Sequence, residues 1–179
     1  MKRAIFVVAA LILSGCSSPE PVAIKGEVIS CASITFDKSI TKGATIECLD
    51  GSAGTSMELL RGPMIINVWG SWCEGCKQEM PYFVELYQSP LFTSGQIQML
   101  GVNVEEKSKE DAIDYIQKSG MSWPNLEDTS GISKSIFGPG VPVTWFIDEN
   151  GKNIETKIGA YTNKKQLFNQ VEKAFGVKL

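Results

Sequence analysis

Two cysteines separated by two residues have the spacing in this sequence that most directly allows chemistry. They lie in the segment Trp72-Cys73-Glu74-Gly75-Cys76, after an apolar run and at the start of a stretch with helical periodicity. At a helix start, unpaired backbone N–H groups and the positive end of the helix dipole stabilise a thiolate. One helical turn brings the second sulfur within bonding reach. The motif therefore predicts thiol–disulfide exchange, with Cys73 as the nucleophile and Cys76 as the resolving thiol.

Metal binding is the main alternative for a pair of this kind. A structural zinc site uses two such pairs or adds histidines, but the chain has one pair and no histidine. A c-type haem site requires a histidine after the second cysteine, and Lys77 holds that position. The lack of histidine also excludes Ser-His and Cys-His catalytic pairs within the chain. We therefore expect redox chemistry that uses no cofactor and no metal.

The predicted elements around the pair belong to an α/β domain with helices on both faces of a sheet. Apolar runs and β-branched residues predict strands, helical spacing predicts a helix after Cys73 and two further helices, and the Asn150-Gly151 turn predicts a hairpin. The strands are expected over residues 28–36, 45–49, 65–69, 98–104, 143–148 and 153–158, and the two further helices over residues 109–119 and 167–174.

Composition limits the classes of function. The chain has 179 residues, of which 43% are apolar and 21% charged, which suits one globular domain and is too apolar for a disordered chain. The formal net charge is −3, which provides no electrostatic basis for a nucleic-acid partner. There are five cysteines, an odd number, so one of them must have a fate different from the others.

The first residues account for the odd cysteine. A basic start and ten apolar residues fit the core of a secretory signal and are too short to span a bilayer. Leu13-Ser14-Gly15-Cys16 then resembles a bacterial lipobox, in which the signal is cut before a cysteine that carries lipid. We expect a signal peptide at 1–15, a lipid-anchored tether at 16–26 and a domain at 27–179. An ordinary signal peptide with an incidental cysteine is the alternative.

The residues on both sides of the Cys-x-x-Cys motif resemble the thioredoxin family. Residues 67–73 are similar to the strand and loop that deliver that family's active site, and residues 140–148 to its cis-proline loop and following strand. The resemblance implies a cis bond before Pro142, and a substrate strand that pairs with the backbone before the proline. It assigns Trp72, Val141 and Pro142 to substrate binding, and it also counts Pro142 among the catalytic residues. From the residues alone, the proline could begin an ordinary turn.

Within that family, the match is best to the membrane-tethered reductases of the ResA and TlpA branch. Residues 76–83 are similar to the helix after their active site, and residues 88–138 fit the central insert of that branch. A glutamate three residues after the second cysteine is tied there to thiol proton transfer, and Glu79 holds this position, on the same helical face as Cys76. On spacing alone, Glu79 is a solvated surface residue. Glu106 resembles a second acidic position near the site.

The resemblance covers about residues 45–179 and implies a thioredoxin-like fold, with a central mixed sheet flanked by helices, an N-terminal β extension and a central insert. The dipeptide between the cysteines departs from the pattern, because Gly75 stands where many relatives carry proline. Glu74 adds negative charge beside the thiolate, and strong oxidases of the family often use a histidine in this dipeptide. We therefore expect a reducing protein.

The other two cysteines, Cys31 and Cys48, lie on the predicted N-terminal strands, outside the thioredoxin core. In an oxidising compartment we expect them to form a structural disulfide, because neither has the helix-start setting that activates Cys73. A second redox relay is the alternative.

The resemblance implies an extracytoplasmic protein-disulfide reductase, lipid-anchored to a bacterial membrane and monomeric. Its substrates would be disulfide-containing exported proteins, with apocytochrome c as a candidate. A membrane electron donor of the CcdA or DsbD type would supply electrons. Two alternatives stay open: a disulfide oxidase, and a non-enzymatic lipoprotein that binds a metal or a client protein.

Overall fold

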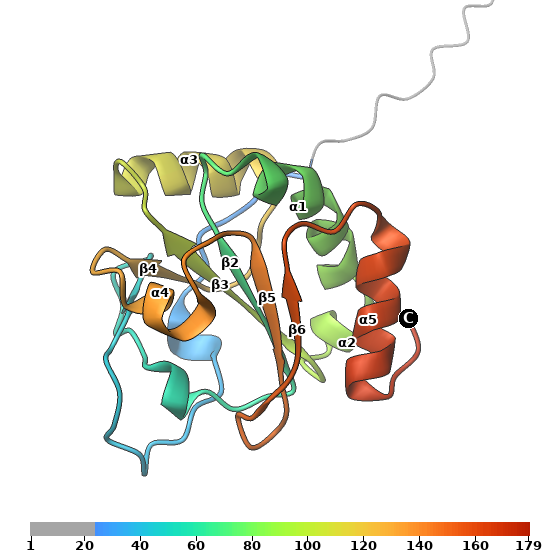
Figure 1. Cartoon of the computed structure of the whole chain (residues 1–179), viewed down its shortest axis with the longest axis horizontal. Helices are drawn as coiled ribbons and strands as arrows, with labels where there is room; N and C mark the ends of the chain where they lie inside the picture. The colour runs from blue at the N-terminus through green and yellow to red at the C-terminus, as the bar shows by residue number, and fades with distance from the viewer. Residues whose placement is uncertain (1–23) are drawn as a thin grey trace, which may run out of the picture.

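A six-stranded mixed sheet forms the centre of the molecule in the computed structural model, which describes residues 24–179 (Figure 1). The strand order is β1-β4-β3-β2-β5-β6. β2, β3 and β4 run parallel, whereas β1, β5 and β6 run antiparallel to their neighbours. The strands are β1 (Glu47–Cys48), β2 (Met64–Trp69), β3 (Gln98–Val104), β4 (Asn125–Asp128), β5 (Val143–Ile147) and β6 (Asn153–Ile158).

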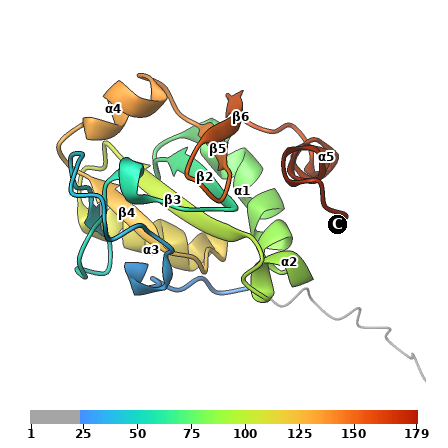
Figure 2. The same cartoon turned by 90° about the horizontal axis from the view of Figure 1, so that it is seen from below.

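Helices cover both faces of this sheet, so the α/β architecture expected from the sequence is confirmed. Figure 2 shows α4 on one side of the sheet and α1 and α3 on the other. The helices are α1 (Glu74–Tyr87), α2 (Pro90–Thr93), α3 (Lys109–Ser119), α4 (Ile132–Phe137) and α5 (Lys164–Phe175), with short 3₁₀ turns η1 (Cys31–Ser33) and η2 (Met57–Leu59). The segment 88–138, expected as a central insert, thus contains α2, β3, α3, β4 and α4.

β2 carries the active-site segment, and all six of its residues are buried. A strand whose two faces are both covered has a nearly continuous apolar sequence. Ile65 and Trp69 join the apolar cluster that includes α1, α3 and α5, while Ile66 and Val68 join the cluster on the opposite face. By the same alternation, Asn67 faces the helix layer that holds α1. A buried polar residue on this strand needs a partner there.

The N-terminal part of the domain differs from expectation. Residues 28–36 do not form a strand: they contain η1 and two isolated bridges, made by Ile29 and Phe36. The Ser30 hydroxyl accepts a hydrogen bond from the Ala32 N–H, which favours a tight turn over an extended chain. The strand expected at 45–49 is shorter than predicted and consists of β1 alone. The β extension is therefore a short edge strand with a looped segment beside it.

The predicted signal peptide, Cys16 and most of the predicted tether lie outside the described residues. Within residues 24–179, no helix is long and apolar enough to cross a membrane.

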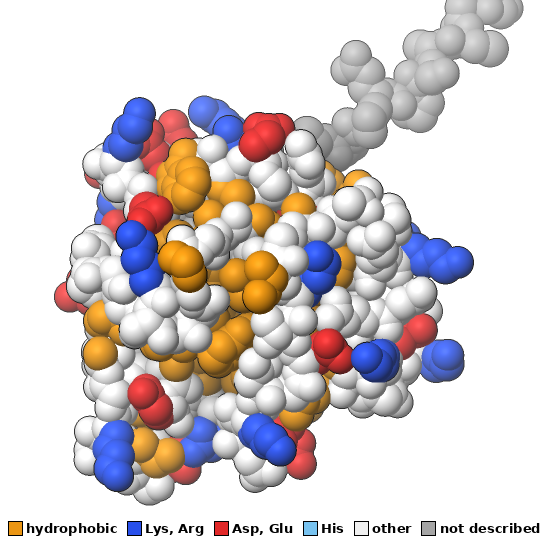
Figure 3. Space-filling view, viewed as in Figure 1, with side chains coloured by type: hydrophobic (Ala, Val, Ile, Leu, Met, Phe, Trp, Pro, Cys, Tyr) orange, Lys and Arg blue, Asp and Glu red, His pale blue; other side chains and the backbone are white. Residues whose placement is uncertain are grey.

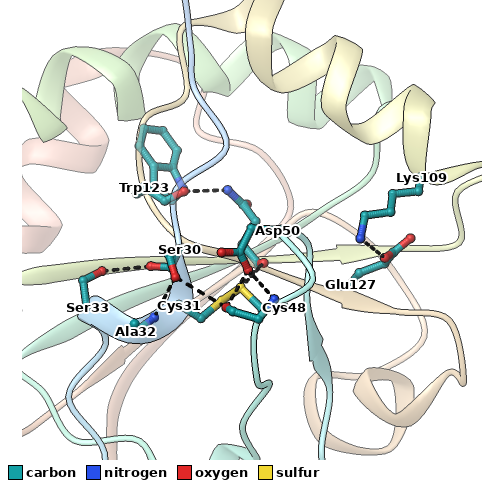
Figure 4. The surroundings of a disulfide bond; sticks show 11 residues. Ser30, Cys31, Ala32, Ser33, Cys48, Asp50, Lys109, Trp123 and Glu127 are labelled. Atoms are coloured by element: carbon teal, nitrogen blue, oxygen red, sulfur yellow. Dashed lines mark hydrogen bonds and ion pairs between the residues drawn. A yellow bond between two sulfur atoms is a disulfide. The ribbon is translucent and has the colours of Figure 1, made fainter.

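Cys31 and Cys48 form a disulfide, as predicted, and it joins the looped segment to the edge of the sheet (Figure 4). Their Cα atoms lie 6.0 Å apart, and the two side chains are 4% and 1% exposed. The backbone carbonyl of Asn125 on β4 lies 3.6 and 3.5 Å from the two sulfurs. The disulfide thus fixes η1 and β1 against β4, on the face of the sheet that α4 covers.

We predict that the double variant Cys31→Ala/Cys48→Ala loses about 3 kcal/mol of unfolding free energy, because the disulfide closes a loop with a sequence separation of 17. Urea denaturation of the oxidised protein measures this loss. The Cys73–Cys76 disulfide remains present in the variant and serves as the internal control. An unchanged unfolding free energy would show that this disulfide has no structural role.

Candidate active site

The Cys-x-x-Cys motif begins α1 directly after β2. Cys73 is the N-cap residue of α1, and its N–H donates to the Gly70 carbonyl in the turn that leaves the strand. Cys73 and Cys76 form a disulfide, with Cα atoms 5.3 Å apart. The Cys76 N–H donates to the Cys73 sulfur at 3.1 Å. In the reduced protein the same N–H and the helix N-terminus would stabilise a thiolate on Cys73.

The proline loop packs against this motif. The Val141–Pro142 peptide bond is cis, as the resemblance implied. A β-carbon placed on Gly75 would lie 3.3 Å from the Pro142 ring and 3.4 Å from the Ala160 side chain. This close approach places Pro142 beside the Cys-x-x-Cys turn and leaves little room for a larger residue at position 75.

Apolar surface lies around the disulfide. The Trp72 side chain is 48% exposed, and its indole N–H donates to the Val104 carbonyl at 3.2 Å, which fixes the ring beside the end of β3. Cys73 itself is only 6% exposed, and Val141 is partly buried. A pocket of about 240 Å³ is lined by both Trp72 and Val141. On the face of the molecule drawn in Figure 3, apolar side chains lie across the middle and charged side chains mainly around them.

Glu79 is fully buried on α1, one helical turn after Cys76, so the alternative of a solvated surface residue is wrong. Its Oε1 accepts a hydrogen bond from the Asn67 amide at 3.0 Å, and its Oε2 accepts one from the Tyr161 N–H at 3.0 Å. The Asn67 amide also donates to the Thr144 hydroxyl at 3.3 Å. β2 and the segment after β6 thus hold this carboxylate directly, and β5 holds the Asn67 amide that donates to it.

Burial raises the pKa of Glu79 to about 7, although the Tyr161 and Asn67 donors and the charge of Lys157 all act to lower it. A carboxyl group with this pKa exchanges a proton near neutral pH. Burial, with the Glu79 charge as a smaller cause, raises the pKa of Tyr161 far above its usual value and that of Tyr115 to about 12. Both phenols therefore stay protonated, and Glu79 is the group suited to accept a proton.

Glu106 holds the loop that precedes Cys73. Its two carboxylate oxygens accept from the Ser71 N–H at 2.5 Å and the Ser71 hydroxyl at 2.6 Å. The Asn103 amide donates to the same carboxylate at 2.8 Å. The acidic position expected near the site is therefore present, and its contacts are those of a residue that positions the active-site loop.

Asn67, Thr144 and Tyr161 were missed in the sequence, although each is buried and takes part in the Glu79 network. Asn67 and Thr144 are register partners on β2 and β5. The available signal was therefore one polar residue within each of two otherwise mainly apolar strands. Tyr161 contributes its backbone N–H to Glu79, and a backbone contact leaves no signature in the side-chain pattern.

A metal requires ligands other than the sulfurs of a disulfide. Among residues 24–179, one group of side chains, Cys31, Cys48 and Asp50, lies close enough together to hold an ion. Both of its sulfurs are in the disulfide described above, so neither offers a thiolate ligand.

Comparison with known proteins places this site in a family. The model of the AhpC/TSA family matches residues 42–155, more than half of the chain. The chain belongs to the AhpC/TSA family. It is similar to the thiol-disulfide oxidoreductase ResA of Bacillus subtilis, with 30% identity over 143 residues, which are 76% of this chain and 78% of that protein. It is also 33% identical over 102 residues to the ResA of Geobacillus thermodenitrificans, covering 56% of this chain and 57% of that protein. The match thus spans little more than half of this second relative.

Solved structures of similar fold confirm the thioredoxin-like architecture. StoA from Bacillus subtilis has a TM-score of 0.57 and 24% identity, and the match covers 72% of this chain and 95% of StoA. A thio-disulfide isomerase from Thermus thermophilus has a TM-score of 0.59 and 18% identity, and the match covers 77% and 95% of the two chains. At sequence identities below 25%, these similarities show a shared fold and no more for this member of the AhpC/TSA family.

We predict that Glu79→Gln removes a pH-dependent loss of stability. Because the folded-state pKa of Glu79 is raised to about 7 from 4.5, its stabilising contribution is complete below about pH 4.5 and is lost as pH rises through about 7. The loss amounts to about 3 kcal/mol, the free-energy equivalent of the pKa difference. Urea denaturation across this pH range should show the decline in the wild type and its absence in Glu79→Gln.

The exposed Glu85, on the same helix, provides the matched control. Glu85→Gln should retain the wild-type decline. If Glu79→Gln retained it as well, Glu79 would not be the group whose ionisation destabilises the folded protein.

Proposed function

We propose that this protein is an extracytoplasmic, membrane-anchored thiol–disulfide oxidoreductase that reduces disulfides in exported proteins. The observation that carries the proposal is the Cys73–Cys76 disulfide at the N-terminus of α1, one turn before a buried carboxylate. The family and the names of its ResA relatives support the same reaction class.

The reaction would proceed in two exchange steps. The Cys73 thiolate attacks one sulfur of a substrate disulfide and forms a mixed disulfide, and the first substrate thiol leaves. Cys76 then attacks the Cys73 sulfur and releases the second substrate thiol. Two electrons pass to the substrate, and the protein is left with the Cys73–Cys76 disulfide that the structure contains.

Glu79 would take the proton of the Cys76 thiol before the second step. A thiolate is the attacking species in disulfide exchange, and a buried thiol needs a nearby acceptor for its proton. Cys76 and Glu79 are both fully buried, three residues apart on α1, and therefore on one face of the helix. The pKa of Glu79, raised to about 7 by burial, suits the transfer of a proton in either direction at neutral pH.

The substrate would lie between Trp72 and the Val141–Pro142 loop. Trp72, next to Cys73 in the sequence, offers half-exposed apolar area and lines a pocket together with Val141. The backbone before Pro142 would pair with an extended segment of the substrate, as the thioredoxin resemblance implies. Apocytochrome c is a candidate substrate by that resemblance alone.

Membrane attachment would come from the N-terminal segment. The lipobox-like sequence before Cys16 supports cleavage there and a lipid on that cysteine, with residues 16–26 as tether and residues 27–179 as the domain. The Cys31–Cys48 disulfide fits an oxidising compartment. Continued reduction there requires electrons, for which a membrane donor of the CcdA or DsbD type is the proposed partner of a monomeric protein.

Trapping with cysteine variants tests this function. Cys76→Ser should accumulate a mixed disulfide through Cys73, because the resolving thiol is absent, and mass spectrometry of the trapped species identifies the client. Cys73→Ser should trap nothing and should lose disulfide reductase activity with insulin as substrate. Activity that survives in Cys73→Ser would refute the assigned nucleophile. Tight, stoichiometric metal binding by the reduced wild type would favour a binding protein instead.

A further inference from the structure

The Asn67 side chain contains an unpaired buried atom at the centre of the Glu79 network. Asn67 is 1% exposed, and its Oδ1 has no hydrogen-bond partner among the residues that the structure describes. A buried acceptor without a partner costs free energy comparable to a lost hydrogen bond. The Nδ2 of the same amide makes two bonds, to Glu79 at 3.0 Å and to Thr144 at 3.3 Å.

This orientation of the amide suits the ionised form of Glu79. A carboxylate only accepts hydrogen bonds, so Nδ2 must face it and Oδ1 must point away. A protonated carboxyl group instead carries an O–H donor, and an amide nitrogen beside it offers no acceptor. The amide must then turn by about 180° to place Oδ1 where Nδ2 lies, within bonding distance of the Glu79 Oε1.

The other partners of the network tolerate this reversal. The Thr144 hydroxyl both donates and accepts, so it can accept from Nδ2 in one orientation and donate to Oδ1 in the other. The Tyr161 N–H is a fixed donor to the Glu79 Oε2 and favours the carbonyl form of that oxygen, so Oε1 is the oxygen better suited to carry the proton. The acid proton therefore belongs on the side of Asn67.

We propose that the Asn67 amide reverses when Glu79 gains a proton, so that it donates to the carboxylate and accepts from the acid. The inference deepens the proposed function, on which its relevance to catalysis rests. Asn67 is then a positioning residue: it keeps Glu79 hydrogen-bonded in both protonation states and holds the acid proton on Oε1.

The other titratable groups near Glu79 do not stabilise both of its protonation states in this way. Lys157 on β6 acts on the carboxylate through its charge alone, which favours only the ionised form. Tyr115 on α3 and Tyr161 both remain neutral because their pKa values are raised. Glu74, in the first turn of α1, is close enough to contribute to the raised pKa of Tyr115 and carries no proton donor when ionised.

The test follows the Asn67 side-chain amide by ¹H–¹⁵N NMR in the oxidised full chain, across the titration of Glu79. As Glu79 gains its proton, we expect the two amide protons to lose about tenfold in protection from exchange and to change their chemical shifts. The midpoint of these changes should equal the midpoint of the chemical-shift titration of the Glu79 carboxyl carbon. In Glu79→Gln, whose amide nitrogen donates as the acid does, the Asn67 signals should match the low-pH wild type at every pH. Asn67 signals that stay constant through the Glu79 titration would overturn the inference.

The Asn103 amide provides a matched control, because it also donates to a carboxylate, that of Glu106. That carboxylate already accepts two bonds from Ser71, so the Asn103 signals should not follow the Glu79 midpoint.

A variant without the amide separates a reversing partner from a fixed donor. Asn67→Leu removes a bond from both forms of Glu79 if the amide reverses, so the midpoint should rise by less than about one pH unit. A fixed donor stabilises only the carboxylate, and its loss would raise the midpoint by about one unit or more, contradicting the inference. These measurements need no turnover. If trapping by Cys76→Ser fails, the proposed function is refuted while the behaviour of the amide is decided by the spectra alone.

Discussion

The central constraint in this molecule is the burial of one ionisable carboxyl group against the sheet, directly after the reactive disulfide on α1. Glu79 has no exposed surface, and its two oxygens accept from donors that come from β2 and from the segment after β6. Burial of a charge without such partners is costly, so the surrounding elements must hold these donors in place. The β2·β5 register, which pairs Asn67 with Thr144, is part of that requirement.

The carboxylates of Glu74 and Glu79 both influence the chemistry of the thiol pair. The helix start and the Cys76 N–H favour a thiolate on Cys73, whereas the negative charge of Glu74, and of Glu79 when ionised, opposes it. No histidine is present to supply a compensating positive charge. A strongly oxidising pair owes its potential to a stabilised reduced form, which this arrangement of charges does not favour.

The residues that carry the proposed chemistry could largely be predicted from the sequence. Local patterns were sufficient for the Cys-x-x-Cys pair on a helix start, for β2, β3, β5 and β6, and for the spacing of Cys76 and Glu79. The burial of Glu79 was not visible in the spacing, which fits a surface residue equally well. It depends on β5 and the segment after β6, which lie more than sixty residues further along the chain.

The errors have a similar cause. Residues 28–36 have the β-branched composition of a strand, but a serine cap and the disulfide to Cys48 hold them in a turn. β4 was not expected from the sequence: it is short, and its ladder is made with β3 and β1, so tertiary pairing rather than local propensity defines it. Local composition thus predicted β2, β3 and β5 and the alternating edge strand β6, and failed where distant partners decide the structure, at β4 and in the segment joined to Cys48.

The central claim is that the Cys73–Cys76 pair acts as a reductant, and its reduction potential tests this claim most directly. Equilibration of the purified protein with glutathione or dithiothreitol redox buffers at pH 7 measures that potential. The account predicts a value near that of thioredoxin, about −270 mV. A value near that of DsbA, about −120 mV, would contradict it and identify the protein as an oxidant of its clients.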